Sequence, residues 1–205
     1  MRTNKREKVI LEVAEKEFLQ KGFAGARIVE IAERAEVSQS MLNYYFKSKE
    51  MLFDRVMTEK IRQLKESVTV VFGMDGITVV EKIKEVVERH FEFLCENPDL
   101  PRFVINELTV RPEYVKKIKD EGLPDLKNVV QILQRDLDAA TSEGETAQID
   151  AATLMMDILS LNFFTFIALP IFDSVIEGFD REEYLRQRVQ ENVHLILKRI
   201  KPDIQ

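Results

Sequence analysis

Six polar side chains between Ser38 and Lys47 recur at a spacing that places them on one side of a short helix. The set carries no charge before its last member, whereas an ordinary solvated helix holds more Glu and Lys. Gln and Asn can form bidentate hydrogen bonds with adenine, Ser can contact several bases, and Tyr and Lys donate to phosphate oxygens. This chemistry suits the major groove of double-stranded DNA. The set is Ser38, Gln39, Ser40, Asn43, Tyr44 and Lys47.

A helix-turn-helix must position these side chains, and residues 28–47, IVEIAERAEVSQSMLNYYFK, fit that pattern. Ala32 is the small residue that lets the second helix approach the first, and Leu42 is the branched residue that fixes the second helix from beneath. We expect helices over 27–35 and 39–45, with Ser38 as the N-cap of the second. The remaining buried positions are Ile31, Ala35, Val37 and Tyr45 or Phe46.

The turn between these helices contains one unfavourable residue. Most helix-turn-helix proteins place Gly where this chain has Glu36, because the position often needs a positive φ. A left-handed backbone at Glu36 would cost on the order of 1 kcal/mol.

The whole chain is predicted to be all-α. Its 205 residues include only 7 Gly and 6 Pro, with 45% hydrophobic and 32% charged residues, which excludes a disordered tail or a Gly-rich β protein. The net charge is −6, but residues 1–60 carry +2 and residues 61–205 carry −8, so the basic surplus lies at the N-terminus. The early run of Arg2, Lys5, Arg6 and Lys8 is either an arm that reaches phosphate or a solvated end.

Apolar spacing and breaker residues predict the other helices. Gly22 ends the first helix, and Ser48 caps the fourth. The predicted ranges are 3–21, 49–71, 77–97, 100–110, 113–120, 126–142, 151–172 and 181–199, with Pro170 breaking the helix over 151–172 near its end.

The span 151–172 is apolar almost all round, which invites a membrane interpretation. We reject it, because Asp157, Ser160 and Asn162 interrupt the span and Pro170 breaks it. A soluble helix of this kind must be covered on every face. With the last helix it could form a four-helix bundle with a second copy, or both helices could pack in the monomer core. The predicted homodimer interface is the stripe Leu185, Val189, Val193 and Ile196.

The first 55 residues resemble the N-terminal domain of the TetR family of bacterial transcriptional regulators. The resemblance extends over three helices and their joints: Val9-Ile10-Leu11, Ala14, Phe18, Gly22-Phe23, Ile31-Ala32, Val37-Ser38, Leu42, Phe46, Ser48-Lys49-Glu50 and Leu52. It implies a DNA-binding domain over 1–48, continuing into a connecting helix over 49–72, and a ligand-binding and dimerisation domain over 73–205. The rest of the chain matches that family in architecture only.

A single cysteine, Cys95, and charges in the N-terminal segment MRTNKREKVI indicate a cytoplasmic protein. The resemblance implies a ligand-released repressor that binds a palindromic operator as a dimer. Three departures matter: Arg27 replaces the family's Thr or Ser at the start of the second helix, Asn43 its Tyr, and Tyr45 its His. Lys49 matches the family's Lys at the start of the fourth helix. We expect base contacts from Gln39, Ser40 and Asn43, and phosphate contacts from Arg27, Ser38, Tyr44, Tyr45, Lys47 and Lys49.

The resemblance also implies a largely apolar small-molecule effector among the middle helices. Aromatic residues at helical spacing can equally be core, and His90 can be a satisfied core or surface histidine. The candidate pocket residues are His90, Phe91, Leu94, Phe103, Tyr114, Phe163 and Phe166.

No enzyme is expected, because metal-ligand clusters, nucleophile elbows and phosphate-binding loops do not occur in the sequence. No cofactor or metal is expected either. Cys95 is predicted to be an inert thiol, since Glu92 and Glu96 would raise its pKa. A helical DNA-binding protein regulated by protein partners, without a small ligand, stays as the alternative; a cavity in the middle helices would argue against it.

Overall fold

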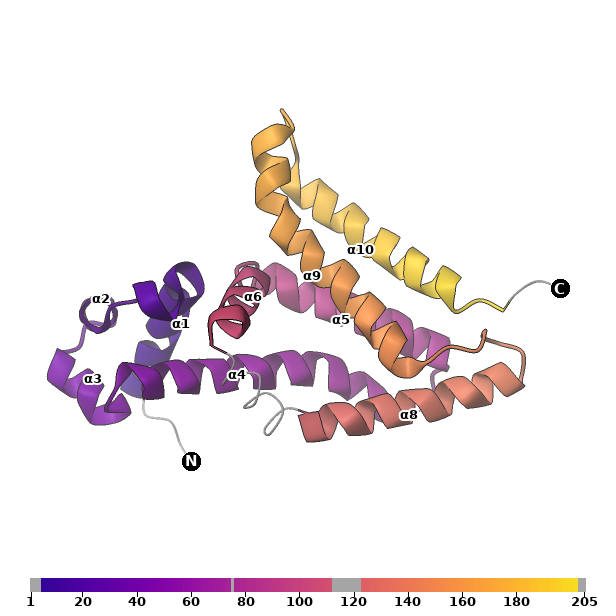
Figure 1. Cartoon of the computed structure of the whole chain (residues 1–205), viewed down its shortest axis with the longest axis horizontal. Coiled ribbons are helices and arrows are strands. Elements are labelled where there is room, and N and C mark those ends of the chain that lie inside the picture. The colour runs from indigo at the N-terminus through magenta and orange to yellow at the C-terminus, as the bar shows by residue number, and fades with distance from the viewer. Residues whose placement is uncertain (1–4, 75, 112–122, 203–205) are drawn as a thin grey trace. The chain divides into compact units, whose positions relative to one another are not determined.

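The computed structural model describes residues 5–74, 76–111 and 123–202, and every regular element within them is a helix (Figure 1). The all-α prediction is therefore confirmed. The predicted helix over 113–120 and the start of the first helix at Thr3 lie outside the described residues.

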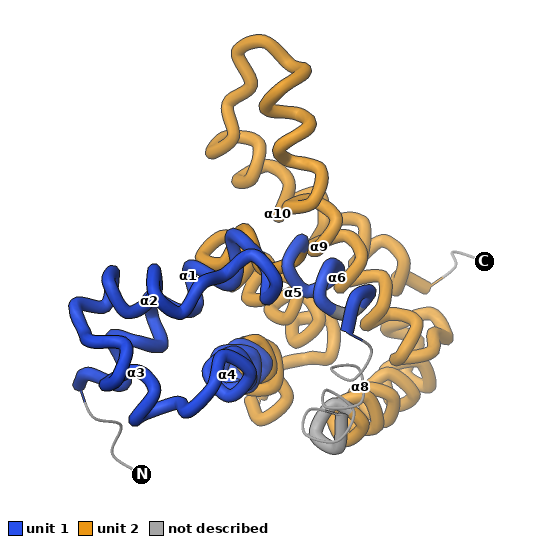
Figure 2. Tube along the Cα trace, turned by 60° about the vertical axis from the view of Figure 1, so that its left-hand side comes forward, with its two compact units in different colours: residues 1–63, 102–116 blue, residues 64–101, 117–205 orange. Residues whose placement is uncertain are grey.

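The chain divides into two compact units, residues 1–63 with 102–116 and residues 64–101 with 117–205 (Figure 2). We call them the N-terminal and C-terminal units. The predicted division put residues 100–110 in the second domain. In the structure residues 102–116 belong to the N-terminal unit, where Phe103 packs against Phe53 with ring centroids 5.8 Å apart.

The N-terminal unit begins with α1 (Lys5–Gly25), in which Gly22 leaves helical geometry at φ 68° and ψ 175°. The predicted helix end at Gly22 thus appears as a break. Then follow α2 (Ile28–Arg34), α3 (Gln39–Phe46) and α4 (Lys49–Thr69). Within this unit α2 packs on both α1 and α3. The core is apolar and includes Ile10, Phe18, Ile31, Leu42, Leu52 and Phe53.

The C-terminal unit contains the short 3-10 helix η1 (Val70–Gly73), α5 (Val79–Glu96), α8 (Leu123–Ser142), α9 (Ala151–Val175) and α10 (Arg181–Arg199). The helix α6 (Leu100–Val110) starts at the boundary between the units. The helices α5, α9 and α10 pack against one another, and α8 packs on α5 and α9. Their shared core includes Ile83, Val87, Leu133, Leu154, Ile158, Val193 and Ile196.

Side-chain caps fix several helix starts. The Thr78 hydroxyl accepts from the Glu81 amide while the Glu81 carboxylate accepts from the Thr78 amide, which forms a reciprocal capping box. The Asp150 and Asp180 carboxylates accept from amides three residues further on.

The helix α9 corrects one prediction, because it continues through Pro170 to Val175. Pro170 lies only about a turn and a half from the helix end, so its missing N–H removes one backbone bond there. By length and composition α9 could cross a membrane. Its buried side nevertheless includes Asn162 and Thr165, and Asp157 pairs with Arg199 of α10 at 2.6 Å.

Candidate nucleic-acid interface

Serine hydroxyls cap the starts of α3 and α4. The Ser38 hydroxyl accepts from the Met41 amide at 3.2 Å, and the Ser48 hydroxyl accepts from the Met51 amide at 3.2 Å at the start of α4. Both predicted N-caps are confirmed, and they satisfy amides that the first helical turn leaves unpaired.

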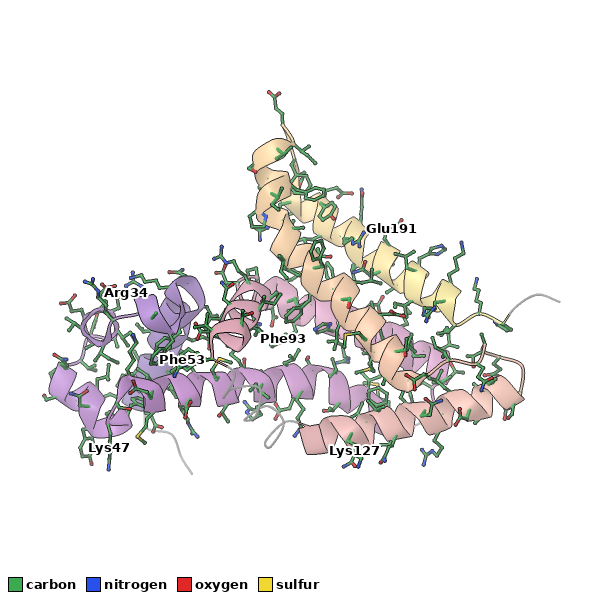
Figure 3. The ribbon with its side chains drawn as sticks, in the orientation of Figure 1. Arg34, Lys47, Phe53, Phe93, Lys127 and Glu191 are labelled. Carbon is green, nitrogen blue, oxygen red and sulfur yellow. The ribbon has the colours of Figure 1, made fainter. Side chains whose placement is uncertain are left out.

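The two sides of α3 differ as the spacing predicted. Leu42 and Phe46 are buried, at 1% and 5% exposure, while Tyr45 is half-buried. The opposite side is exposed, with Tyr44 at 79%, and Figure 3 shows the Lys47 side chain pointing away from the ribbon. We call this surface the recognition face. It comprises Ser38, Gln39, Ser40, Asn43, Tyr44 and Lys47.

The turn before α3 is left-handed at Glu36, where φ is 53°. Glu36 therefore adopts the positive φ that the turn of the motif often needs. A glycine at this position would adopt it without strain. Lys47, the C-cap of α3, also has a positive φ of 55°. Residues with a positive φ thus lie both in the turn before α3 and at its C-terminal end.

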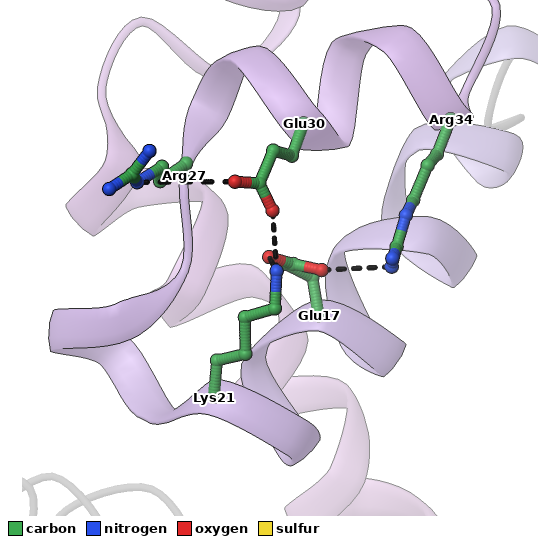
Figure 4. Close-up of polar contacts among 5 residues, drawn as sticks. All are labelled: Glu17, Lys21, Arg27, Glu30 and Arg34. Carbon is green, nitrogen blue, oxygen red and sulfur yellow. Dashed lines mark hydrogen bonds and ion pairs between the residues drawn. The ribbon is translucent and has the colours of Figure 1, made fainter.

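A network of ion pairs holds α2 to α1 beside this face (Figure 4). The Glu17 carboxylate, which is fully buried, receives Lys21 Nζ at 2.7 Å on Oε1 and an Arg34 guanidinium N–H at 2.9 Å on Oε2. Lys21 also pairs with Glu30, whose pKa it lowers by hydrogen bonding. Buried Glu17 is thus charge-compensated from both helices, as a buried carboxylate requires.

The same network reaches Arg27, the predicted phosphate anchor. The Arg27 side chain is 78% exposed, and its Nε lies 3.9 Å from Glu30 Oε1. Arg27 occupies the N-cap of α2 and its side chain makes no capping hydrogen bond. Its guanidinium is held near the surface and stays open to an anion such as phosphate.

Lys49, the other predicted anchor at a helix start, lies in a different environment. Its ammonium stands 4.6 Å from the centroid of the Phe23 ring, and the Arg111 guanidinium lies 3.9 Å from the same ring. A cation over an aromatic face is stabilised by the ring quadrupole. A phosphate contact by Lys49 must therefore compete with, or add to, this stacking.

Sequence reasoning missed Glu107 of α6. Its carboxylate is 7% exposed and accepts a hydrogen bond of 2.8 Å from the Phe23 amide, which the break at Gly22 frees from helical bonding. A cavity of about 500 Å³ adjoins this contact, between the end of α1 and α6. A partner 84 residues away leaves no local pattern, so no sequence signal could have indicated it.

The predicted effector pocket is brought together only in part. The rings of His90 and Phe163 are stacked at 6.1 Å, and those of Phe91 and Phe166 lie 5.4 Å apart, so α5 and α9 do converge. Leu94 follows Phe91 by three residues on α5 and is fully buried. Phe103 belongs to the N-terminal unit, where it packs on Phe53 and lines the cavity beside α6, and Tyr114 lies outside the described residues.

His90 is a core histidine with a partner that the sequence did not indicate. It is fully buried, and Asn162 Nδ2 lies 3.1 Å from its Nδ1 and donates to the Val87 carbonyl at 3.0 Å. Asn192 of α10 in turn donates to Asn162 Oδ1 at 2.9 Å. Burial lowers the pKa of His90 to about 4, so the ring is neutral at physiological pH.

The predicted dimer stripe on α10 needs a correction. Val193 and Ile196 are 6% and 1% exposed and belong to the core of their own unit, which leaves them unavailable to a second copy. Leu185 and Val189 are half-buried. Within the C-terminal unit, most of the exposed large apolar side chains lie on α9 instead: Met156, Phe164, Ile171, Phe172 and Val175, with Leu195 on α10.

A second cavity, of about 470 Å³, opens on this surface between α9 and α10. Neither this cavity nor the one beside α6 is lined by the predicted pocket residues His90, Phe91, Phe163 or Phe166. Partial burial, followed by Glu92 and Glu96, raises the pKa of the Cys95 thiol, in the direction the sequence predicted. Over the described residues, no group of His, Cys, Asp or Glu side chains is arranged to hold a metal ion.

Comparison with known proteins adds three similarities. Residues 10–56 match the model of the bacterial regulatory proteins of the tetR family. The chain is 31% identical over 137 residues to YdgC, an uncharacterized HTH-type transcriptional regulator of Bacillus subtilis, and this match covers 64% of each chain. It is 28% identical over 198 residues to the HTH-type transcriptional regulator RutR of Escherichia coli, covering 96% of this chain and 91% of RutR.

The fold also resembles solved structures over nearly its whole length. The transcriptional regulator FadR of Bacillus subtilis, solved in complex with stearoyl-CoA, aligns with a TM-score of 0.67 at 22% identity, covering 94% of this chain and 98% of FadR. At this identity the likeness concerns the fold: an N-terminal helix-turn-helix followed by a larger helical part.

Proposed function

Since the chain belongs to the TetR family of bacterial regulatory proteins and is a DNA-binding transcriptional regulator, we propose that it acts as a homodimeric repressor on a palindromic operator, from which a small molecule releases it. The observation that carries the DNA half is the recognition face of α3, which is exposed, polar and anchored from beneath by Leu42 and Phe46. The protein would act in the cytoplasm, where its operator lies.

The exposure of the recognition face supports the following DNA contacts. Gln39, Ser40 and Asn43 lie on the exposed side of α3 and contact base edges, since their short uncharged side chains leave room for the helix in the major groove. Phosphate contacts fix the register around them. They come from Arg27, Ser38, Tyr44, Tyr45, Lys47 and Lys49.

The exposed apolar side chains of α9 supply the argument for a dimer. Phe164 is 65% exposed and Val175 is 75% exposed, and contiguous apolar surface of this kind marks an interaction site. A second copy of α9 and α10 would cover it in a four-helix arrangement. Two recognition faces would then read half-sites about 34 Å apart, or a multiple of that.

Release by an effector requires a ligand that prefers the state whose half-site spacing does not fit DNA. A coupling of about 1–3 kcal/mol changes operator affinity by five- to hundredfold. The convergence of Phe91, Phe163 and Phe166 with a buried histidine supports a largely apolar ligand in the C-terminal unit. Neither of the two cavities described above is lined by these residues, so regulation by a protein partner without a small ligand stays as the alternative.

Selection of bound fragments from genomic DNA tests the first half of this proposal. We expect enrichment of an inverted repeat, and half-site substitutions that weaken binding symmetrically. A screen of small molecules for release of that fragment tests the second half. Recovery of fragments with no shared sequence would contradict the assignment of base contacts to α3.

A further inference from the structure

Three buried polar atoms on α5 and α10 have no hydrogen-bond partner: His90 Nε2, Arg188 Nε and Asn192 Oδ1. His90 and Asn192 are themselves fully buried. An unpaired buried donor or acceptor is costly, and buried polar groups in native proteins nearly always have a partner. Ordered water or a bound ligand completes the hydrogen bonding of such atoms in native proteins.

Two of the three atoms belong to residues that one chain of hydrogen bonds joins, and Arg188 lies one helical turn before Asn192 on α10. Arg188 and Asn192 are four residues apart on α10, so their side chains follow one another on one face of the helix. Asn192 bonds to Asn162 of α9, and Asn162 bonds to His90 of α5. We call His90, Asn162, Arg188 and Asn192 the polar layer; it joins the three helices that pack together in this unit.

The hydrogen bonds within the polar layer fix what it offers. Asn162 Nδ2 donates to His90 Nδ1, which makes that nitrogen an acceptor and, in a neutral ring, assigns the proton to Nε2. His90 Nε2–H and Arg188 Nε–H are then two unpaired donors, and the guanidinium carries a permanent positive charge. Asn192 Oδ1 is an unpaired acceptor, suited to a hydroxyl or N–H of the same ligand.

The surroundings of the layer are aromatic. The Phe163 ring lies nearly parallel to the imidazole, at an angle of 15°, and Phe91 and Phe166 are in ring contact. Phe163 is only half-buried, so its ring separates His90 from solvent without being locked in the core. The body of a ligand that reaches the donors must consequently be apolar.

We propose that the polar layer binds a small organic carboxylate with an apolar body, whose carboxylate accepts hydrogen bonds from His90 Nε2 and Arg188 Nε. The inference rests on the proposed function, since it names the chemical class of the effector. Because the layer ties α5 to α9 and α10, its occupancy acts on the helices that position the two copies.

Isothermal titration with matched probes tests the class of ligand. The probes are benzoate, diphenylacetate and the methyl ketone that is isosteric with diphenylacetate. We expect diphenylacetate to bind the wild-type protein about tenfold more tightly than its ketone, which corresponds to about 1.4 kcal/mol. The substitution Arg188→Gln should abolish that preference. Arg186→Gln, at an exposed position of the same helix, is the matched control and should preserve it.

Nuclear magnetic resonance of the wild-type protein gives a second measurement that needs no variant. The chain contains two histidines, and His194 is exposed, so ¹⁵N-histidine labelling yields a reporter and an internal control. We expect the His90 ring to be the Nε2–H tautomer and its proton signal to shift when diphenylacetate is added. The signals of His194 should not move.

Several results would overturn the proposal. Equal affinity of wild-type protein for the carboxylate and its ketone would do so, as would an unchanged preference in Arg188→Gln or no binding of either carboxylate at millimolar concentration. Operator binding by the same preparations is measured by gel shift. If it persists while the probes fail, the ligand inference is wrong and DNA binding stands; if no operator is bound, the proposed function fails independently.

Discussion

The recognition face and the polar layer are both built largely from uncharged amides and short polar groups, yet they lie at opposite extremes of burial. On the recognition face Gln39 and Asn43 are exposed, and water satisfies them until bases replace it. In the polar layer Asn162 and Asn192 are fully buried, and each bond they lose is lost to an apolar interior. Apart from Ser38, which caps α3, the residues of the recognition face can therefore change without affecting stability, whereas those of the polar layer cannot.

The largest effect that follows from this comparison is on stability. Asn162→Ala removes the hydrogen bonds to His90 Nδ1, the Val87 carbonyl and Asn192 Nδ2, so we expect a loss of about 3 kcal/mol in the free energy of unfolding. Urea denaturation followed by circular dichroism measures it. Ser160→Ala, at an exposed position of α9, is the control and should stay within about 0.5 kcal/mol. Similar losses in both variants would mean that the hydrogen bonds of Asn162 contribute no more to stability than an exposed side chain does.

On the recognition face, substitutions should lower operator affinity and leave stability unchanged. Gln39→Ala and Asn43→Ala should each cost about 1–3 kcal/mol of operator affinity and relax base preference. Unfolding free energies should be unchanged, because both side chains are exposed. Titration with operator and with random-sequence duplexes separates the loss of sequence-specific affinity from the loss of non-specific affinity. Gln190→Ala in the C-terminal unit is the control. Equal losses on both duplexes would show that neither side chain contacts bases.

The pH dependence of stability sharpens the comparison further. The pKa of His90 is lowered to about 4 by burial, while the ordinary value in the unfolded chain is about 6.5, so the unfolded state binds the proton more readily. Stability should therefore fall as pH decreases below 6.5, by roughly 2 kcal/mol from this residue between pH 7.5 and 5. His90→Phe should show a correspondingly shallower dependence in urea denaturation. An identical pH profile in both proteins would refute the buried, neutral state.

The smallest effect concerns a single surface charge. Lys47→Gln should reduce the slope of log affinity against log salt concentration by about 0.9, since one phosphate contact is lost. Lys201→Gln, exposed in the C-terminal unit, serves as the control. Fluorescence anisotropy at several salt concentrations gives the slope. If the slope does not change, Lys47 does not contact phosphate.

The two regions also differ in how far sequence could predict them. The recognition face follows from spacing within 20 residues: Ala32 and Leu42 are buried and Ser38 caps α3 because local helical geometry settles all three. The positive φ of Glu36 could be anticipated from the motif in the same way.

The polar layer could not be predicted, because its bonds join residues 72 and 30 positions apart. In the sequence Asn162 is only an interruption in an apolar run. The prediction of a dimer interface on α10 needed correction for a related reason. Val193 and Ile196 have the spacing of a buried face, but spacing alone cannot say whether the chain's own core or a second copy buries it.

The hydrogen bond between the Phe23 amide and Glu107 has a consequence for synthesis and for protein engineering. Residues 1–63 emerge from the ribosome well before residue 107. The nascent N-terminal unit therefore cannot form its contacts with Phe103 and Glu107 until α6 has emerged. A fragment ending at residue 63 would leave the Phe53 ring without Phe103 and the Phe23 amide without its acceptor. Excising the DNA-binding part of this regulator as a stand-alone module therefore requires grafting α6 onto it.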